Sequence, residues 1–247
     1  METILVTGGT GGLGWPTVEQ LNAPGRDVRV LSRKPGPGRY VGDLGTGSGL
    51  AAALDGVDTV LHLATSRGIK DSAQTRVLLS AARAADIRHI IYISIVGVEK
   101  IPYFYYRNKV ECERLISESD IPWTILRATQ FHHFVGGFFR SQRRLPALFS
   151  LDVPDQPIAV EEVAARLVEL TGASPAGRVP DIGGPECLPL SELGRQWQLA
   201  HGTKKRQWTL HIPGKTIRPF QAGHHMTPLP GAGRKSFAEY AAEEAGR

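Results

Sequence analysis

The sequence is poor in cysteine and has no long apolar run. Its only cysteines, Cys112 and Cys187, are far apart and follow no metal-binding spacing, which argues against a disulfide framework and fits a reducing compartment. No apolar stretch approaches the length that crosses a bilayer, and the start METILVTGG has neither the basic segment nor the cleavage site of a secretory signal. We therefore expect a cytoplasmic protein without a membrane segment.

Signatures of nucleic-acid and metal binding are also missing. The net charge is +5, and the densest basic run, at 204–206, is followed by Trp208, but no helix-turn-helix, RNP or zinc spacing accompanies it. A solvated face is the simpler interpretation, and nucleic-acid binding is not expected. The neighbouring histidines at 132–133 and 224–225 would diverge on a helix or a strand, so we expect no metal site.

What the first half does contain is an alternation of β-rich and helical segments, which is typical of βαβ units with a parallel sheet. Strands are predicted at 3–7, 28–32, 40–41, 59–64, 89–94 and 123–127, and helices at 12–22, 49–54, 71–85 and 102–118. The third of these helices has apolar residues at a spacing that keeps them on one face, so it should pack against the sheet: Val77, Leu78, Ala81, Ala82 and Ala85.

Strands such as HIIYISIV are nearly continuous in apolar residues, which indicates helices on both faces of the sheet. The predicted fold class is therefore α/β, a doubly wound parallel sheet (Rossmann fold). Past residue 129 the alternation weakens and proline and glycine become frequent. We expect a dinucleotide-binding domain at 1–130 and a smaller, irregular substrate-binding region at 131–247, with helices near 160–170 and 190–200.

A glycine-rich loop, TGGTGGLG, follows the first predicted strand and precedes the first helix. Gly9, Gly11 and Gly14 fit G-x-G-x-x-G, while Gly8, Gly11 and Gly14 fit G-x-x-G-x-x-G. Glycines here allow the turn, let backbone N–H groups approach a pyrophosphate and let the helix pack on the strand. The residues expected at the cofactor are Thr7, Gly8, Gly9, Thr10, Gly11, Gly12, Leu13 and Gly14.

The end of the second strand indicates which dinucleotide binds. NAD usually meets an acidic side chain there, but this chain has Ser32, Arg33 and Lys34, whose hydroxyl and cationic donors suit a 2′-phosphate. We therefore expect NADP(H) as the cofactor. The alternative is that Arg33 and Lys34 are merely exposed.

With these motifs the chain resembles the short-chain dehydrogenase/reductases, in particular the atypical NmrA-like NAD(P)-binding branch. The resemblance rests on TGGTGGLG, GDL, VLHLAT, YISIVG, YYRNK and WTILRATQFHHF. It implies that Asp43 and Leu44 border the adenine, that Leu63, Ala64 and Thr65 pass the ribose and pyrophosphate, and that the segment after Arg127 passes the nicotinamide. That segment begins with Ala128 and Thr129, where relatives carry a proline in place of Ala128.

The wider superfamily uses a Y-x-x-x-K pair with an upstream serine, and the matching positions are Tyr105, Lys109 and Ser94. Tyrosine and lysine four apart share a helix face, so the ammonium of Lys109 can lie near both the phenol and the cofactor ribose, where it favours the phenolate. Tyr105 would then protonate a carbonyl oxygen while Ser94 hydrogen-bonds it. The alternative is a packing tyrosine, since Tyr106 is also near the lysine face and NmrA-like proteins often keep only the lysine.

Phe131, His132 and Phe134 follow the sixth strand, where related proteins line the substrate pocket; simple packing is the alternative. The predicted function is an NADP(H)-dependent oxidoreductase that transfers hydride to a carbonyl, quinone or activated double bond of an apolar small molecule. Two alternatives are a non-catalytic NADP(H) sensor that binds a protein partner, and, less favoured, an NAD-dependent sugar-nucleotide epimerase or dehydratase.

Overall fold

A computed structural model describes residues 2–66, 68, 70–228 and 231–246. Its main feature is a seven-stranded parallel sheet with the strand order β3-β2-β1-β4-β5-β6-β9. The first six strands match the predicted ones in order. The strands are β1 (Glu2–Thr7), β2 (Arg26–Ser32), β3 (Arg39–Val41), β4 (Thr59–His62), β5 (His89–Ile95), β6 (Trp123–Ala128) and β9 (Gly177–Arg178).

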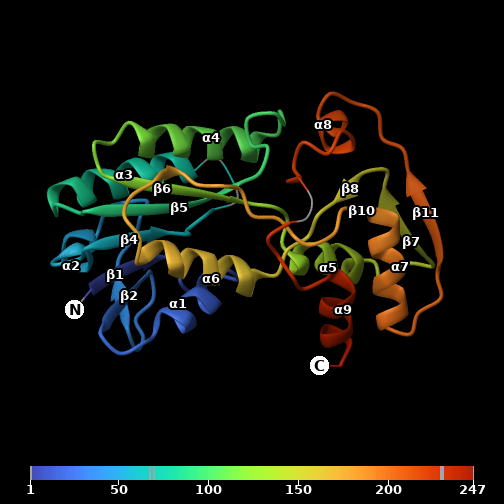
Figure 1. Ribbon diagram of the computed structural model, residues 1–247, viewed down its shortest axis with the longest axis horizontal. Coiled ribbons are helices and arrows are strands. Elements are labelled where there is room, and N and C mark those ends of the chain that lie inside the picture. Colours follow the sequence, from blue (N-terminus) through green and yellow to red (C-terminus); the bar gives the residue numbers. More distant parts are fainter. Residues whose placement is uncertain (1, 67, 69, 229–230, 247) are drawn as a thin grey trace. The chain divides into compact units, whose positions relative to one another are not determined.

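Helices cover both faces of this sheet (Figure 1). One face carries α2 (Leu50–Leu54), α3 (Asp71–Ala84) and α4 (Phe104–Ser117), and the other carries α1 (Gly14–Leu21) and α6 (Val160–Thr171). The expected doubly wound sheet is therefore confirmed. It follows that the carboxyl ends of β1 and β4 lie at one edge, where ligands of such sheets bind.

The core under α2, α3 and α4 explains why these segments are helical. Leu50 and Leu54 of α2, Leu78 of α3 and Ile116 of α4 are buried against apolar side chains of the sheet. The predicted apolar face of α3 is confirmed, since Leu78 and Ala82 are buried and its other members pack against the same core. Full burial of each leucine contributes about 1.5–3 kcal/mol, so packing rather than helix propensity holds the layer together.

A second group of elements has its own core. It contains α5 (His132–Ser141), α7 (Leu190–Ala200), α8 (Ile217–Gln221), α9 (Phe237–Ala245), a parallel pair β7 (Ala147–Leu151) and β11 (Arg206–Leu210), and an antiparallel pair β8 (Pro154–Asp155) and β10 (Leu188–Pro189). Phe139, Trp197 and Phe237 are buried together. The helices at 160–170 and 190–200 are confirmed as α6 and α7, whereas α5, α9 and the β7–β11 pair replace structure that we expected to be irregular.

By compactness the chain divides into two units that are discontinuous in sequence. The first comprises 1–94, 103–127 and 163–180, and the second 95–102, 128–162 and 181–247. The sequence instead suggests two continuous domains, 1–130 and 131–247. The assignment of cofactor binding to the former and of substrate binding to the latter stays a prediction. Among the described residues, none of the helices has the length and apolarity needed to span a membrane.

Candidate active site

Strand register brings three predicted cofactor segments together in the first unit. Thr7, the last residue of β1, is opposite Leu31 of β2 on one side and His62 of β4 on the other. The glycine loop therefore leaves the sheet between the segment that starts at Ser32 and the segment that starts at Leu63. Adjacent carboxyl ends of strands are the place where a dinucleotide lies in this fold class.

The glycine loop is built so that side chains do not fit. Gly8 has a positive φ of 72°, and a Cβ on it would lie 2.7 Å from the backbone nitrogen of Ala64. A Cβ on Gly14 would collide with the carbonyl oxygen of Gly8. The loop can therefore pack closely on the β4 segment and on the start of α1, and the register Gly8, Gly11, Gly14 is the one with tight backbone contacts.

The loop also presents polar backbone toward solvent. Gly11 donates its N–H to the Gly8 carbonyl at 2.9 Å, which closes the turn, while Thr10, Gly11 and Gly12 are exposed and Leu13 is buried beneath them. The helix α1 begins at Gly14, and the N–H groups of a first helical turn suit an anion. Trp15, in that first turn, is 66% exposed.

The residues expected to read the 2′-phosphate lie beside this loop. Lys34 donates its backbone N–H to the Ser32 hydroxyl at 3.1 Å, which turns the chain sharply at the end of β2. Arg33 and Lys34 are exposed, and no acidic side chain that the structure describes is paired with either of them. Their charges are thus available for an anionic ligand.

The predicted adenine-side residues form the next turn. Asp43 accepts the backbone N–H of Gly45 at 2.7 Å and its own carbonyl accepts that of Gly47 at 2.8 Å. The side chain of Leu44 is buried in the core of the first unit. Any contact that Leu44 makes with an adenine would therefore use its backbone, and its proposed role stays a prediction.

A buried polar network supports the loop from within the sheet. The Thr7 hydroxyl contacts Nδ1 of His62 at 2.7 Å and accepts the N–H of Ala64 at 3.3 Å. Nε2 of His62 contacts the Thr75 hydroxyl at 3.2 Å. Burial, and then the charge of Lys109, lowers the pKa of His62 to about 3, so its ring is neutral at physiological pH. Sequence reasoning placed Thr7 at the cofactor but missed His62.

Tyr105 contacts the segment that follows β4. Its phenol lies 3.4 Å from the hydroxyl of Thr65, and Thr65 donates to the carboxylate of Asp71 at 2.6 Å. Tyr105 is half-buried, whereas Tyr106 is buried and packs edge-on against Tyr103 and Tyr105. Of the two neighbouring tyrosines, Tyr105 is the less buried, and its phenol contacts the segment after β4.

Lys109 lies deeper than the Y-x-x-x-K pattern suggests. It is 3% exposed, its ammonium donates to the Ile93 carbonyl at 3.1 Å, and it lies 4.6 Å from the centre of the Tyr92 ring. Burial lowers the pKa of Lys109, while the nearby charge of Asp71 opposes this shift. The ammonium is therefore held against β5, and its contact with a cofactor ribose stays a prediction.

Ser94 is the clearest sign of a missing partner. It lies near the carboxyl end of β5 and is buried, and its hydroxyl has no hydrogen-bond partner among the residues that the structure describes. A buried polar atom without a partner is costly, so it indicates a ligand or water at that place. A substrate oxygen would meet this need.

The remaining predicted residues belong to the second unit. Ala128 and Thr129 are buried, with the Thr129 N–H donating to the Ile182 carbonyl at 3.0 Å. His132 is also buried, and its Nε2 lies 3.0 Å from the Pro157 carbonyl oxygen. Its ring packs against Phe237 and Tyr240, and burial lowers its pKa to about 4.

Phe131 and Phe134 stack on each other with ring centres 6.2 Å apart, and Phe134 is partly exposed. This geometry leaves both aromatic rings suited to an apolar wall, whereas His132 has the contacts of a packing residue. Their assignment to a substrate pocket stays a prediction.

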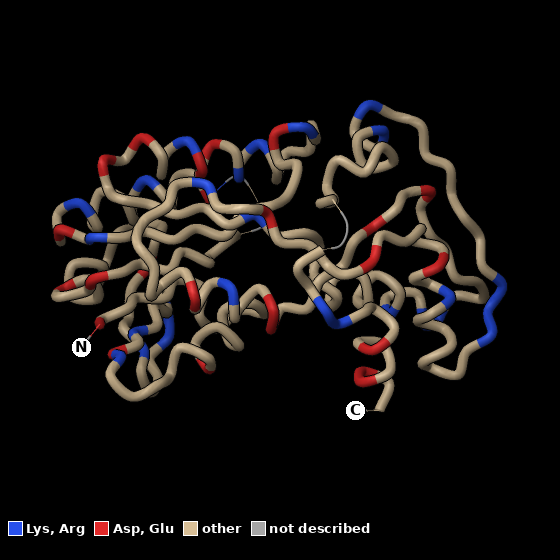
Figure 2. The backbone as a smooth tube through the Cα atoms, viewed as in Figure 1, with Lys and Arg blue, Asp and Glu red and all other residues tan. Residues whose placement is uncertain are grey.

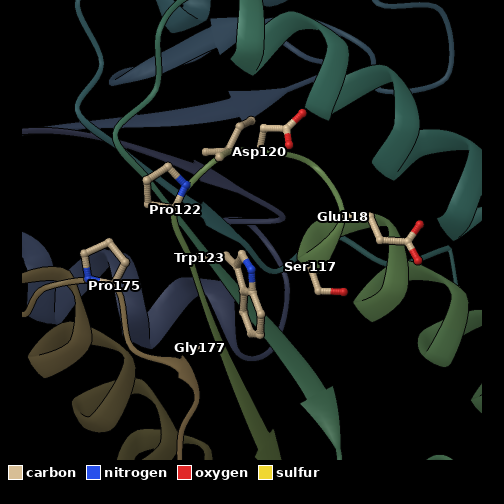
Figure 3. A pocket seen from close by; sticks show the side chains of 8 residues that line it. Ser117, Glu118, Asp120, Pro122, Trp123, Pro175 and Gly177 are labelled. Atoms are coloured by element: carbon tan, nitrogen blue, oxygen red, sulfur yellow. The ribbon is translucent and has the colours of Figure 1, made fainter.

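A pocket of about 470 Å³ lies elsewhere in the first unit (Figure 3). It is lined by Glu118, Asp120, Pro122, Trp123 and Gly177, among others. Because Trp123 and Gly177 begin β6 and β9, this pocket is at the amino ends of the strands. Ligands of doubly wound sheets bind at the carboxyl ends, so this pocket is not the candidate active site.

The fold and the loop geometry are those of an α/β dinucleotide-binding protein. A family model described as NAD(P)H-binding matches residues 8–171, and the chain belongs to this family. It is 32% identical over 207 residues to the (4-alkanoyl-5-oxo-2,5-dihydrofuran-3-yl)methyl phosphate reductase of Streptomyces griseus, covering 78% of this chain and 72% of that protein.

Two solved structures share the fold over nearly the whole chain. One is the NADPH-dependent quinone oxidoreductase of Escherichia coli in complex with NADPH, with a TM-score of 0.85, 20% identity and coverage of 98% of this chain and 99% of that one. The other is the triphenylmethane reductase of Citrobacter sp. with NADP(H), with a TM-score of 0.78, 18% identity and coverage of 98% and 99%. The predicted family, fold and oxidoreductase class agree with these findings, as does an NAD(P)H cofactor.

Proposed function

We propose that this protein is an NADP(H)-dependent oxidoreductase that reduces a carbonyl, a quinone or an activated double bond of a small molecule. The observation that carries the proposal is the buried hydroxyl of Ser94, which has no hydrogen-bond partner within the described ranges of the chain. Ser94 directly follows Ile93, whose carbonyl accepts a hydrogen bond from Lys109. The closely packed glycine loop supports a dinucleotide in the same unit, because Gly8 and Gly14 leave no room for side chains where a pyrophosphate approaches the backbone.

NADPH, when bound, supplies the hydride that adds to the substrate carbon. Tyr105 gives its phenolic proton to the substrate oxygen, so the double bond becomes a single bond that carries the added hydrogen. Ser94 donates a hydrogen bond to the same oxygen as its negative charge develops. The buried ammonium of Lys109 favours the phenolate that remains, which then recovers a proton from solvent.

The steady-state rate of NADPH oxidation tests this function. An acylated furanone phosphate and a quinone are the first substrates to try, because the Streptomyces griseus relative is named for the former and the Escherichia coli neighbour for the latter. Tyr105→Phe should lower kcat by about 10²- to 10⁴-fold, the usual contribution of a general acid, with NADPH affinity unchanged. Tyr103→Phe is the matched control, because it also removes a phenolic hydroxyl, but from an exposed residue at the start of α4.

If NADPH binds but neither substrate class is reduced, the enzyme proposal is refuted for these chemistries. A change in binding to a protein partner with the NADPH/NADP⁺ ratio would then favour the sensor alternative. We also propose a reducing, cytoplasmic location, supported by the free thiols of Cys112 and Cys187. Tagged protein that is recovered from an oxidising compartment would contradict this location.

A further inference from the structure

Asp71 is a buried carboxylate that the proposed reaction does not yet use. It is the first residue of α3 and is 3% exposed. One oxygen accepts the Thr65 hydroxyl at 2.6 Å, and the other accepts the backbone N–H of Ser66 at 2.6 Å and the Ser66 hydroxyl at 2.5 Å. Acceptance from three donors at once is the pattern of an ionised acid.

These contacts do not look like ordinary stabilisation of a helix end. An acidic residue in the first turn usually satisfies the free N–H groups of its own helix. Both oxygens of Asp71 instead hold the chain that follows β4, at Thr65 and Ser66. The carboxylate therefore fixes the segment that touches Tyr105.

The contact with Asp71 also fixes the direction of the next hydrogen bond. A threonine hydroxyl has one proton, and the short distance to the carboxylate places that proton toward Asp71. Toward Tyr105 the Thr65 oxygen then offers only lone pairs. The contact of 3.4 Å is therefore one in which the phenol donates and Thr65 accepts.

Packing of α3 on α4 keeps this chain of contacts in place. Ser72 donates its backbone N–H to the Asn108 side chain at 2.9 Å, and Arg76 pairs with Glu111 at 2.5 Å. Basic and acidic residues are interspersed along α4 (Figure 2). The Ser72 contact thereby ties the start of α3 to the α4 turn between Tyr105 and Lys109, and the Arg76 pair joins the two helices one turn further along.

The contact between Thr65 and Tyr105 is also suited to exchange. Thr65 is exposed and Tyr105 is half-buried, so a substrate can reach the phenol. A hydrogen bond of 3.4 Å is long and weak, and a carbonyl oxygen that comes closer would replace it. The phenolic proton is thus held in place until a better acceptor arrives.

We propose that Asp71 is a positioning residue for Tyr105: through the Thr65 hydroxyl it holds the phenol as a hydrogen-bond donor. This role rests on the proposed function of Tyr105 as proton donor. Asp71→Asn replaces a carboxylate, which can only accept hydrogen bonds, by an amide, which carries N–H donors as well as an oxygen acceptor. Thr65 is then able to turn its proton toward Tyr105, and the direction of the phenolic proton is no longer fixed.

The experiment compares kcat, KM for NADPH and the NADPH dissociation constant in purified variants. Asp71→Asn should lower kcat about tenfold and Thr65→Val about three- to tenfold, the range for losing one hydrogen bond. The KM for NADPH and the NADPH dissociation constant of Asp71→Asn should stay within about twofold of wild type. Thr65→Ser keeps the hydroxyl and should keep kcat within about twofold. Asp86→Asn is the matched control, since Asp86 is exposed just beyond the other end of α3 and asparagine tolerates its positive φ.

The double variant tests whether Asp71 acts through Thr65. In the Thr65→Val background, Asp71→Asn should lower kcat by no more than about twofold further, because residues that act as a unit are not additive. Full additivity, or a kcat of Thr65→Val equal to wild type, would overturn the proposal. If Asp71→Asn does not fold, the kcat values of Thr65→Val and Thr65→Ser alone test the proposal: it requires a lower kcat in Thr65→Val and a nearly unchanged kcat in Thr65→Ser. Loss of activity in Tyr105→Phe without loss in these variants refutes the role of Asp71 only, whereas normal activity of Tyr105→Phe refutes the proposed function.

Discussion

Removal of the Arg33 side chain is expected to weaken NADPH binding while leaving NADH binding unchanged. Arg33 is exposed beside the glycine loop, and none of the acidic residues within the described part of the chain neutralises it. Hydrogen bonds to charged groups contribute about 1.5–3 kcal/mol, and exposure to salt water favours the lower end. Since 1.4 kcal/mol corresponds to a factor of ten, Arg33→Ala should raise the NADPH dissociation constant about tenfold.

Quenching of tryptophan fluorescence is a suitable assay, because Trp15 is exposed in the first turn of α1, directly after the loop. NADPH, NADP⁺ and NADH are titrated into wild type and Arg33→Ala at two ionic strengths. The preference for the 2′-phosphorylated forms should narrow as salt rises, since the contact is electrostatic. Calorimetry provides a second readout that does not depend on Trp15.

Arg83→Ala is the matched control in the same unit. Arg83 is near the carboxyl end of α3 and binds the Ser119 carbonyl at 2.7 Å, at the edge of the sheet away from the loop. It should leave both dissociation constants unchanged. An equal loss of NADPH and NADH affinity in Arg33→Ala, or wild-type protein that prefers NADH, would refute our interpretation of the β2 end.

The remaining predictions concern stability and loop geometry. Gly8 and Gly25 both have a positive φ, which costs alanine about 1–2 kcal/mol, but of the two only Gly8 has a backbone close to where the added methyl group would lie. Gly8→Ala should therefore destabilise the protein more than Gly25→Ala, and it should also weaken NADPH binding. Thermal melting and NADPH titration check these two effects. The pKa of His62 falls from 6.5 in the unfolded chain to about 3 on folding, so the neutral ring contributes fully to stability above pH 6.5 and this contribution is lost as the pH falls. At about pH 5 the free energy of unfolding, measured by urea titration, should be lower by ~2 kcal/mol than at neutral pH. His62→Gln should abolish this difference. Glu113→Gln removes the carboxylate that pairs with the buried Arg127 and should cost about 3–5 kcal/mol in urea unfolding. Glu118→Gln, which breaks an exposed pair, should cost under about 1 kcal/mol, and equal costs would contradict the importance of burial.

Local periodicity explains why the first unit could be predicted from sequence. The apolar runs of β1, β4 and β5 and the glycine loop are contiguous signals, and their order implies the parallel sheet. Several ends differ, for example β4 stops at His62 rather than at residue 64 and α4 begins at Phe104 rather than at residue 102. The short edge strand β9, which the sequence did not predict, completes the sheet.

The second unit depends on contacts that are distant in sequence. In α5, two consecutive glycines lower the helix propensity, and Gly136 is small because Trp197 and Tyr240 approach it closely. The pairing of β7 with β11 joins segments that are separated by α7 and by long connections, and Trp208 and Leu210 in β11 are largely exposed. Neither feature has a local signature.

The candidate site shows the same limit. The Y-x-x-x-K spacing pointed to Tyr105 and Lys109, but not to Asp71, because a single acidic residue at a helix start has an ordinary explanation. Its contact with Thr65 becomes visible only when the chain after β4 and the start of α3 are seen together. Likewise, the burial of Lys109 against Tyr92 required the packed helix and strand.

The interleaved division of the chain has a consequence for synthesis on the ribosome. Residues 163–180, which include most of α6 and the edge strand β9, belong to the first compact unit. A nascent chain that has emerged only to residue 130 lacks this helix layer and the β6–β9 edge, so its sheet is still open there. The second unit likewise needs residues on both sides of that insertion. Vectorial synthesis therefore cannot complete one unit before beginning the other, and an amino-terminal fragment is expected to depend on chaperones until the later segments arrive.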